Sequence, residues 1–118
     1  MIVNERVVSY INSRDRGNSD ICNTIEKEAI EDQVPIIRKE MGNLLKVLLK
    51  LKQPGSILEV GTAVGYSSIL MSENMPKDCR IVTIENYDKR FQAARNNIKG
   101  EGIEDCIQLI AGVALNVL

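Results

Sequence analysis

Three short apolar runs in the second half of the chain place the tightest constraint on its fold. They cover residues 57–60, 81–84 and 107–110 and consist almost entirely of Ile, Leu and Val. Fully apolar strands of this length are typical of parallel sheets that are covered on both faces. Helical patterns over residues 66–74 and 87–99 separate the runs. The order predicts a βαβαβ unit with right-handed crossovers, which is half of a doubly wound, Rossmann-like α/β sheet.

The first third of the chain is predicted to be helical. Asn18 or Ser19 can cap a helix that runs to about Gln33, and its apolar residues recur at helical spacing on one face. The inward positions of this helix are Ile21, Ile25 and Ala29. Pro35 disfavours helix at Val34 and is suited to open a second helix.

The second helix has an apolar and a basic side. Lys39, Lys46 and Lys50 fall on the basic side, which is predicted to be the solvated face; a weak contact with a polyanion is the alternative. The residues predicted to point inward are Ile37, Met41, Leu44, Leu45, Leu48 and Leu51.

A chain of 118 residues is long enough for one small domain or part of a larger one. The turn Gln53-Pro54-Gly55 divides it into a helical segment, residues 1–53, and the βαβαβ segment, residues 54–118. The first strand of such a sheet normally has a neighbour on both sides, and here only one side can be filled. We therefore expect this chain to be the N-terminal half of a longer protein, truncated within the sheet.

Composition excludes several classes of function. The absence of histidine rules out Ser-His-Asp and Cys-His catalysis and histidine metal sites within this chain. Three widely spaced cysteines without a CxxC motif favour a reduced, cytoplasmic protein. A net charge of −1 gives no support for binding nucleic acid through bulk charge. No apolar stretch approaches the roughly 20 residues of a membrane-spanning helix, so no membrane association is expected.

The loop after the first run is the candidate binding site, because ligands of open α/β sheets bind at the carboxyl ends of the strands. Gly61 and Gly65 allow close approach of the backbone, and the following helix N-terminus offers N–H groups to an anion. Ala63 and Tyr66 stand where a dinucleotide GxGxxG fingerprint needs glycine, which disfavours a protein that binds NAD. The acidic Glu59 at the strand end suits an ammonium group.

These features predict a ligand with an amino-acid end and a ribose end. The hydroxyls of Tyr66 and Ser67 would lie near its carboxylate, and Glu59 near its amino group. Glu85 ends the second run, 24 residues after Gly61, where a carboxylate can accept both hydroxyls of a ribose. Asn86 and Tyr87 would flank the adenine. This combination describes S-adenosylmethionine.

Taken singly, each of these residues has a plainer explanation. Glu59 is equally well explained as a strand-end carboxylate that pairs with a lysine, and Gly61 and Gly65 as ordinary turn residues. Glu85 alone is more often a favourable charge at a helix N-terminus. Their combination, on two strands that must be adjacent, favours the binding site.

The sequence also resembles a known family. The motif EVGTAVGYS from Glu59, the motif VTIE ending at Glu85 and the motif GVA at Gly112 resemble bacterial S-adenosylmethionine-dependent O-methyltransferases related to catechol and caffeoyl-CoA O-methyltransferases. The similarity extends from about Tyr10 to the end of the sequence. Within the family, the sequence resembles most closely the branch of tRNA 5-hydroxyuridine methyltransferases.

The resemblance implies a role for each motif residue. Glu59, Gly61 and Thr62 would lie at the methionine end of the cofactor, and Tyr66 and Ser67 at its carboxylate. Glu85 would hold the ribose, and Asn86 lies next to it. The backbone of Val113 and Ala114 would contact the adenine, and Ile37 would close over the cofactor. Many members have aspartate at the position of Val113, which places a side-chain contact to the adenine in doubt.

The resemblance also implies what this chain lacks. The catalytic lysine and the ligands of a divalent metal (Mg) lie on later strands in the family, so we expect no catalytic and no metal-ligating residue here. The longer protein would methylate a hydroxyl of a small catechol-like molecule or of tRNA 5-hydroxyuridine, as a possible homodimer through its N-terminal helices, and this chain alone would be inactive. The alternative is a non-catalytic module that binds S-adenosylmethionine or another adenosine ligand.

Overall fold

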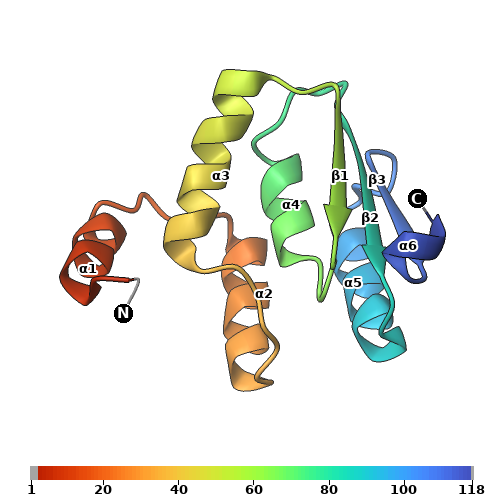
Figure 1. Ribbon diagram of the computed structural model, residues 1–118, viewed down its shortest axis with the longest axis horizontal. Helices are drawn as coiled ribbons and strands as arrows, with labels where there is room; N and C mark the ends of the chain where they lie inside the picture. Colours follow the sequence, from red (N-terminus) through yellow and green to blue (C-terminus); the bar gives the residue numbers. More distant parts are fainter. Residues whose placement is uncertain (1–2, 118) are drawn as a thin grey trace.

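The computed structural model describes residues 3–117 (Figure 1). Its elements follow the predicted order between residues 20 and 111, and a helix that was not individually predicted precedes them. Three helices come first, and a βαβαβ unit and a short final helix follow. The elements are α1 (Glu5–Ser13), α2 (Asp20–Glu31), α3 (Lys39–Lys52), β1 (Ser56–Val60), α4 (Tyr66–Ser72), β2 (Arg80–Glu85), α5 (Asp88–Gly100), β3 (Ile107–Ala111) and α6 (Ala114–Val117).

The three strands form one parallel sheet in the order β1-β2-β3, which confirms the predicted topology. Glu59 on β1 is the register partner of Thr83 on β2, and Glu85 on β2 is the partner of Ala111 on β3. All three strands therefore end at the same edge of the sheet, where parallel α/β sheets bind their ligands.

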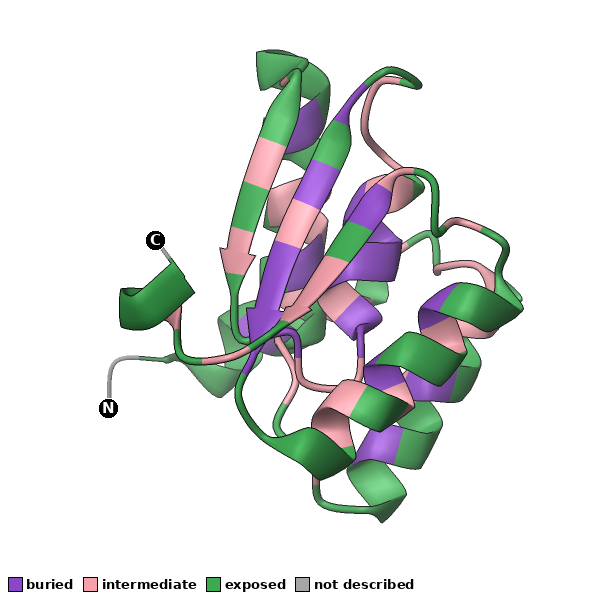
Figure 2. Cartoon of the chain, turned by 90° about the vertical axis from the view of Figure 1, so that its right-hand side faces the viewer, coloured by how far each residue is buried: buried purple, intermediate pink, exposed green. Residues whose placement is uncertain are grey.

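Helices α4 and α5 pack on one face of the sheet, and Figure 2 shows the strands in front of them. The core between them contains Ile69 of α4, Ile81 of β2 and Ile98 of α5, together with Ile25 of α2 and Leu49 of α3. Residues of both predicted segments thus share one core.

The opposite face of the sheet differs from the prediction that both faces are covered. Leu58 and Val60 are 54% and 62% exposed, because no helix of the described residues packs over β1 on this side. An apolar run predicts a strand with apolar residues on both faces, but it does not say which segment covers the second face.

Helix α2 forms as predicted. The hydroxyl of Ser19 accepts a hydrogen bond from the N–H of Cys22 at 3.3 Å and so caps the helix. Cys22, Ile25 and Ala29 are buried, while Ile21 is only partly so. The helix ends at Glu31, two residues before the expected end.

The start predicted for the next helix is wrong. Helix α3 begins at Lys39, and Pro35 lies in an irregular segment, residues 34–38, that precedes it. In this segment both Ile36 and Ile37 pack against the core. Adjacent residues of a helix point about 100° apart, so an irregular backbone is the better way to bury both.

The inward face predicted for α3 is also wrong in most of its residues. Gly42 and Leu49 are buried and Leu45 packs against the core, because Gly42 allows Leu70 of α4 to approach closely. Lys46, predicted to be solvated, donates to the side-chain oxygen of Asn18. The apolar residues left at least half exposed on α3 are Met41, Leu44, Val47, Leu48 and Leu51.

Among the described residues, no helix combines the length and the apolar composition that crossing a membrane requires.

Candidate functional site

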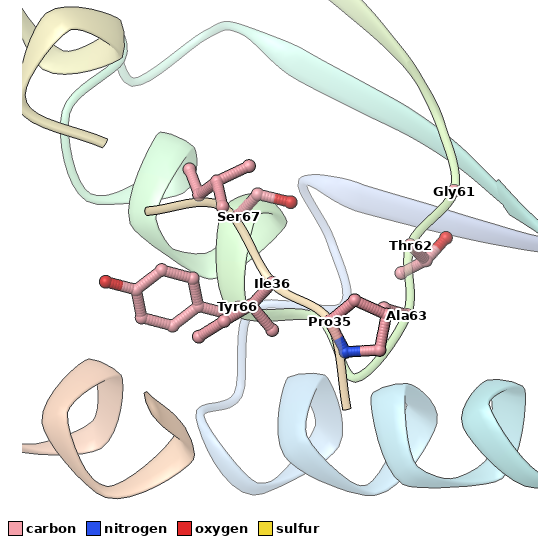
Figure 3. A pocket seen from close by; sticks show the side chains of 8 residues that line it. Pro35, Ile36, Gly61, Thr62, Ala63, Tyr66 and Ser67 are labelled. Atoms are coloured by element: carbon pink, nitrogen blue, oxygen red, sulfur yellow. The ribbon is translucent and has the colours of Figure 1, made fainter. Parts of the chain in front are cut away.

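A cavity of about 230 Å³ lies at the carboxyl end of β1, between the loop that follows the strand and the segment before α3 (Figure 3). It brings together five of the residues predicted from the sequence. Its lining consists of Pro35, Ile36, Ile37, Gly61, Thr62, Ala63, Tyr66 and Ser67. Pro35, Ile36 and Ala63 were not among the predicted site residues, although Ala63 lies within the EVGTAVGYS motif and Pro35 and Ile36 directly precede the predicted Ile37.

The loop between β1 and α4 has an unusual backbone. Gly61, Ala63 and Gly65 have φ values of 92°, 50° and 89°, in the left-handed region that favours glycine. The N–H groups of Gly61 and Thr62 both donate to the carbonyl of Ile84, at 2.8 and 3.2 Å. A Cβ atom built on Gly61 would have no neighbour within 4 Å. The space beside Gly61 is therefore open to a ligand.

The carboxylate of Glu59 is surrounded by hydroxyl groups. Its Oε1 accepts from Ser68 at 2.5 Å and from Thr83 at 2.7 Å, and its Oε2 accepts from Ser67. Ser68 and Thr83 are fully buried, whereas Ser67 lines the cavity. No salt bridge is found for Glu59 among the described residues, so the lysine partner of the plainer explanation is absent there.

The contact with Glu59 decides what Ser67 can offer to a ligand. A serine hydroxyl carries a single proton, and that of Ser67 is donated to Oε2 of Glu59. Its lone pairs remain available at the cavity. In this arrangement Ser67 is suited to accept a hydrogen bond from an ammonium group. The sequence had led us to expect that its hydroxyl lies near the carboxylate of the ligand.

The hydroxyl of Tyr66 points away from Gly61 and Thr62 (Figure 3). It donates to Oε2 of Glu26 on α2 at 3.1 Å and accepts from the amide of Asn18 at 3.3 Å. Burial, together with the nearby charge of Glu26, raises the pKa of the phenol well above its usual range. The phenol group thus links α4 to α2, and its role at a ligand carboxylate stays a prediction.

Glu85 lies at the end of β2 and is only 6% exposed. Its Oε1 accepts from the N–H of Ala63 at 2.7 Å, and its Oε2 accepts from the N–H groups of Asn86 and Tyr87 at 3.1 and 3.0 Å. These three contacts compensate for the burial of the carboxylate. They also tie the carboxyl end of β2 to the loop that lines the cavity.

Three further predicted residues lie at neighbouring strand ends, outside the cavity lining. Asn86 is exposed, and Val113 is 46% exposed in the turn between β3 and α6. The N–H of Gly112 donates to the carbonyl of Glu85 at 2.9 Å, which places the turn with Val113 and Ala114 beside the end of β2.

Within residues 3–117, no group of three or more His, Cys, Asp or Glu side chains is arranged to hold a metal ion. All three cysteines are free, and burial raises the pKa of the Cys22 thiol to about 11.

Residues 14–118 match the family model described as O-methyltransferase. The chain belongs to the O-methyltransferase family. This O-methyltransferase chain is 35% identical over 82 residues to the catechol O-methyltransferase of Niastella koreensis, an alignment that covers 70% of the chain and 37% of that relative.

Two solved structures are similar over 99% of the chain. A methyltransferase from Geobacter sulfurreducens has a TM-score of 0.87 at 25% identity, with 62% of its length covered. The O-methyltransferase TomG from Streptomyces achromogenes, involved in tomaymycin synthesis and solved in complex with SAM, has a TM-score of 0.81 at 30% identity, with 55% covered. The chain thus spans 37% of this curated relative and 55–62% of these two structures.

Proposed function

We propose that this chain binds S-adenosylmethionine and forms the cofactor-binding part of an O-methyltransferase. The observation that carries the proposal is the placement of two carboxylates, Glu59 and Glu85, at the ends of adjacent strands on either side of an open glycine loop. The cofactor carries an ammonium group and a ribose at its two ends, and carboxylates bind both. The complex of TomG with SAM supports this choice of ligand.

The residues that line the cavity, and Glu59 beside Ser67, have separate roles in the proposed complex. Oε2 of Glu59 and Oγ of Ser67 would accept from the ammonium group, and the open side of Gly61 would admit the methionine chain. Thr62 lies in the same wall, and Tyr66 contributes its ring rather than its hydroxyl. Ile37, in the irregular segment 34–38, would cover the ligand from the side of the helical segment.

Glu85 would bind the ribose. A carboxylate offers about four acceptor positions, and backbone N–H groups use three of them. One position is free for a ribose hydroxyl, and a second becomes free if the bond to Ala63 opens. Asn86, Val113 and Ala114 would lie near the adenine, in accordance with their place at the adjoining strand ends.

When bound, the cofactor supplies a methyl group on a sulfonium, ready for transfer to a hydroxyl oxygen. The described residues would bind and orient it. They offer no cluster that fits a divalent metal, so no step through magnesium is assigned to them; a metal and the catalytic residues belong to the longer protein that we propose. We expect no methyl transfer by this chain alone.

For the acceptor, the proposal favours a catechol-like molecule. The name of the relative from Niastella koreensis supports this class, and the net charge of −1 does not favour tRNA 5-hydroxyuridine. We also propose a cytoplasmic location, with free cysteines as support. Residues 1–53 would serve as lid and dimerisation segment, and residues 54–118 as the cofactor-binding segment.

The surface of the first helices supports the proposed homodimer. A groove of about 960 Å³ runs between α1 and α3, and apolar side chains dominate its lining. Val7 of α1 and Leu44 and Val47 of α3 are about half exposed. Contiguous apolar surface of this kind marks sites of protein association.

The proposal is tested by calorimetric titration of the chain with S-adenosylhomocysteine, with a circular dichroism spectrum of the same sample. We expect binding by a folded chain, at one site. A folded chain that does not bind contradicts the proposal for these residues. The alternative is a non-catalytic module that binds S-adenosylmethionine or another adenosine ligand. If the ligand is another adenosine compound, adenosine itself should bind with similar affinity, because such a module has no need of the amino-acid end.

A further inference from the structure

The hydroxyl groups around Glu59 form a chain with a defined direction. Thr62 and Thr83 lie with their Oγ1 atoms 2.6 Å apart, and Thr83 lies 2.7 Å from Oε1 of Glu59. An ionised carboxylate only accepts, so the single proton of Thr83 goes to Glu59. Thr62 must then donate to Thr83. Every hydroxyl proton in this series of hydrogen bonds therefore points toward the carboxylate of Glu59.

The two oxygens of Glu59 are used unequally. Oε1 accepts from Thr83 and Ser68, which fills its two acceptor positions, whereas Oε2 accepts from Ser67 alone. Glu59 itself is not part of the cavity lining, but Oε2 is the oxygen bonded to Ser67, which lines the cavity. Thr83 and Ser68 are fully buried and do not line the cavity. Ser68 contacts the site through Glu59, whereas Thr83 also bonds to Thr62, which lines the cavity.

We propose that Thr83 and Ser68 are positioning residues that fix Oε1 of Glu59 and thereby present Oε2 to the ammonium group of the ligand. This inference rests on the proposed function and adds to it the residues that orient the carboxylate. The three donors come from β2 and α4, which are the best-buried elements around the site. Without them, the side chain of Glu59 could rotate away from the cavity.

The test compares two ligands that differ in one group. S-adenosylhomocysteine carries the amino group, and its deaminated analogue has hydrogen in its place and keeps the carboxylate, ribose and adenine. The ratio of their dissociation constants measures the contact with Glu59. We expect the unsubstituted chain to prefer the aminated ligand by about tenfold or more, as is typical of a charged hydrogen bond.

Thr83→Val removes the hydroxyl and keeps the shape of the side chain. We expect it to weaken binding of S-adenosylhomocysteine and to leave the deaminated ligand nearly unaffected, so that the preference falls by at least about threefold. Thr83→Ser keeps the hydroxyl and should restore the preference. Ser68→Ala removes the other hydrogen-bond donor to Oε1 of Glu59, which comes from α4, and provides the test if Thr83→Val does not fold. Ser72→Ala is its matched control, because the Ser72 hydroxyl bonds to the carbonyl of Ile69 in the same helix.

The outcomes distinguish a failure of the proposed function from a failure of the positioning role of Thr83 and Ser68. Equal weakening of both ligands by Thr83→Val and Ser68→Ala would show a purely structural role and overturn the inference, as would an unchanged preference in both variants. If the unsubstituted chain binds neither ligand, the proposed function fails and the inference fails with it. Binding of both ligands with equal affinity by the unsubstituted chain overturns the ammonium contact and leaves the adenosine end of the site intact.

Discussion

The carboxylate of Glu85 and the backbone N–H of Ala63 are joined by a hydrogen bond of 2.7 Å that connects the end of β2 to the loop after β1. Ala63 has a φ of 50°, which non-glycine residues seldom adopt. The buried carboxylate therefore helps to hold a strained residue in place. Glu85 has a structural task in addition to the ribose contact proposed for it.

Glu85→Ala should lower the affinity for S-adenosylhomocysteine at least about tenfold, since it removes the ribose acceptor and one anchor of the loop. Glu85→Gln keeps the shape and one acceptor oxygen and should have a smaller effect. Calorimetry measures both, and the thermal midpoint of each variant reports the structural part. Unchanged affinity in Glu85→Ala would exclude the ribose assignment.

Gly61→Val should abolish binding and leave the helix content unchanged. The new side chain would enter the open space beside the loop, and a φ of 92° is unfavourable for a β-branched residue. Gly55→Val is the matched control, because Gly55 also has open space around it but lies at the other end of β1 with no positive φ. Retained binding in Gly61→Val would refute the close approach of the ligand at this residue.

Stability should fall as the pH rises from about 9 to 11. The folded chain keeps the Cys22 proton up to a pKa of about 11, whereas the unfolded chain releases it near 9.0, so the unfolded state binds fewer protons in this range. Over this pH range, the free energy of unfolding should fall by at most about 2–3 kcal/mol because of this thiol. Urea unfolding at several pH values measures it.

Cys22→Ala should flatten this decline, and Cys106→Ala, which leaves Cys22 in place, should retain it. Tyr66→Phe should also make the chain less sensitive to alkali, because the pKa of Tyr66 is raised in the folded state and its ionisation opposes folding in the same direction. An identical pH profile in all the variants would contradict the buried environments of both groups.

Leu44→Lys, in the groove between α1 and α3, should shift the chain from dimer to monomer in sedimentation velocity, because a charge would be buried at the proposed interface. Leu115→Lys is the control, since Leu115 is 91% exposed on α6 and outside this groove. A chain that is monomeric before substitution would remove the dimer from the proposal.

The sheet was predictable because its signals are local. Each apolar run is bounded by turn residues, and Gly61 and Gly65 mark the loop where the period changes from strand to helix. The inner face of α3 was not predictable in the same way. This helix has more apolar residues than one face can bury, and tertiary contacts such as those of Gly42 with Leu70 and Ile37 accompany the choice of the inward face.

In the candidate site, the placement of the two carboxylates at neighbouring strand ends was predictable, but the hydroxyl groups around Glu59 were not. Glu59 and Glu85 stand out because carboxylates seldom end apolar strands. The contacts of Thr83 depend on strand register, which pairs it with Glu59. Aligning the ends of the two apolar runs would have revealed this neighbour. No comparable signal pointed to the contact between Tyr66 and Glu26, which depends on how α2 packs against α4.

Among residues 3–117, strand β1 has a hydrogen-bonded neighbour on one side only, whereas β2 lies between two strands. The amide hydrogens of an outer strand exchange with solvent more readily, because less must open to expose them. Glu59 lies on the outer strand, and the groups that hold it lie on β2 and α4. A ligand that contacts both carboxylates would join the outer strand to the inner one. Its binding should therefore be recorded as slower deuterium uptake along β1, at residues that the ligand never touches.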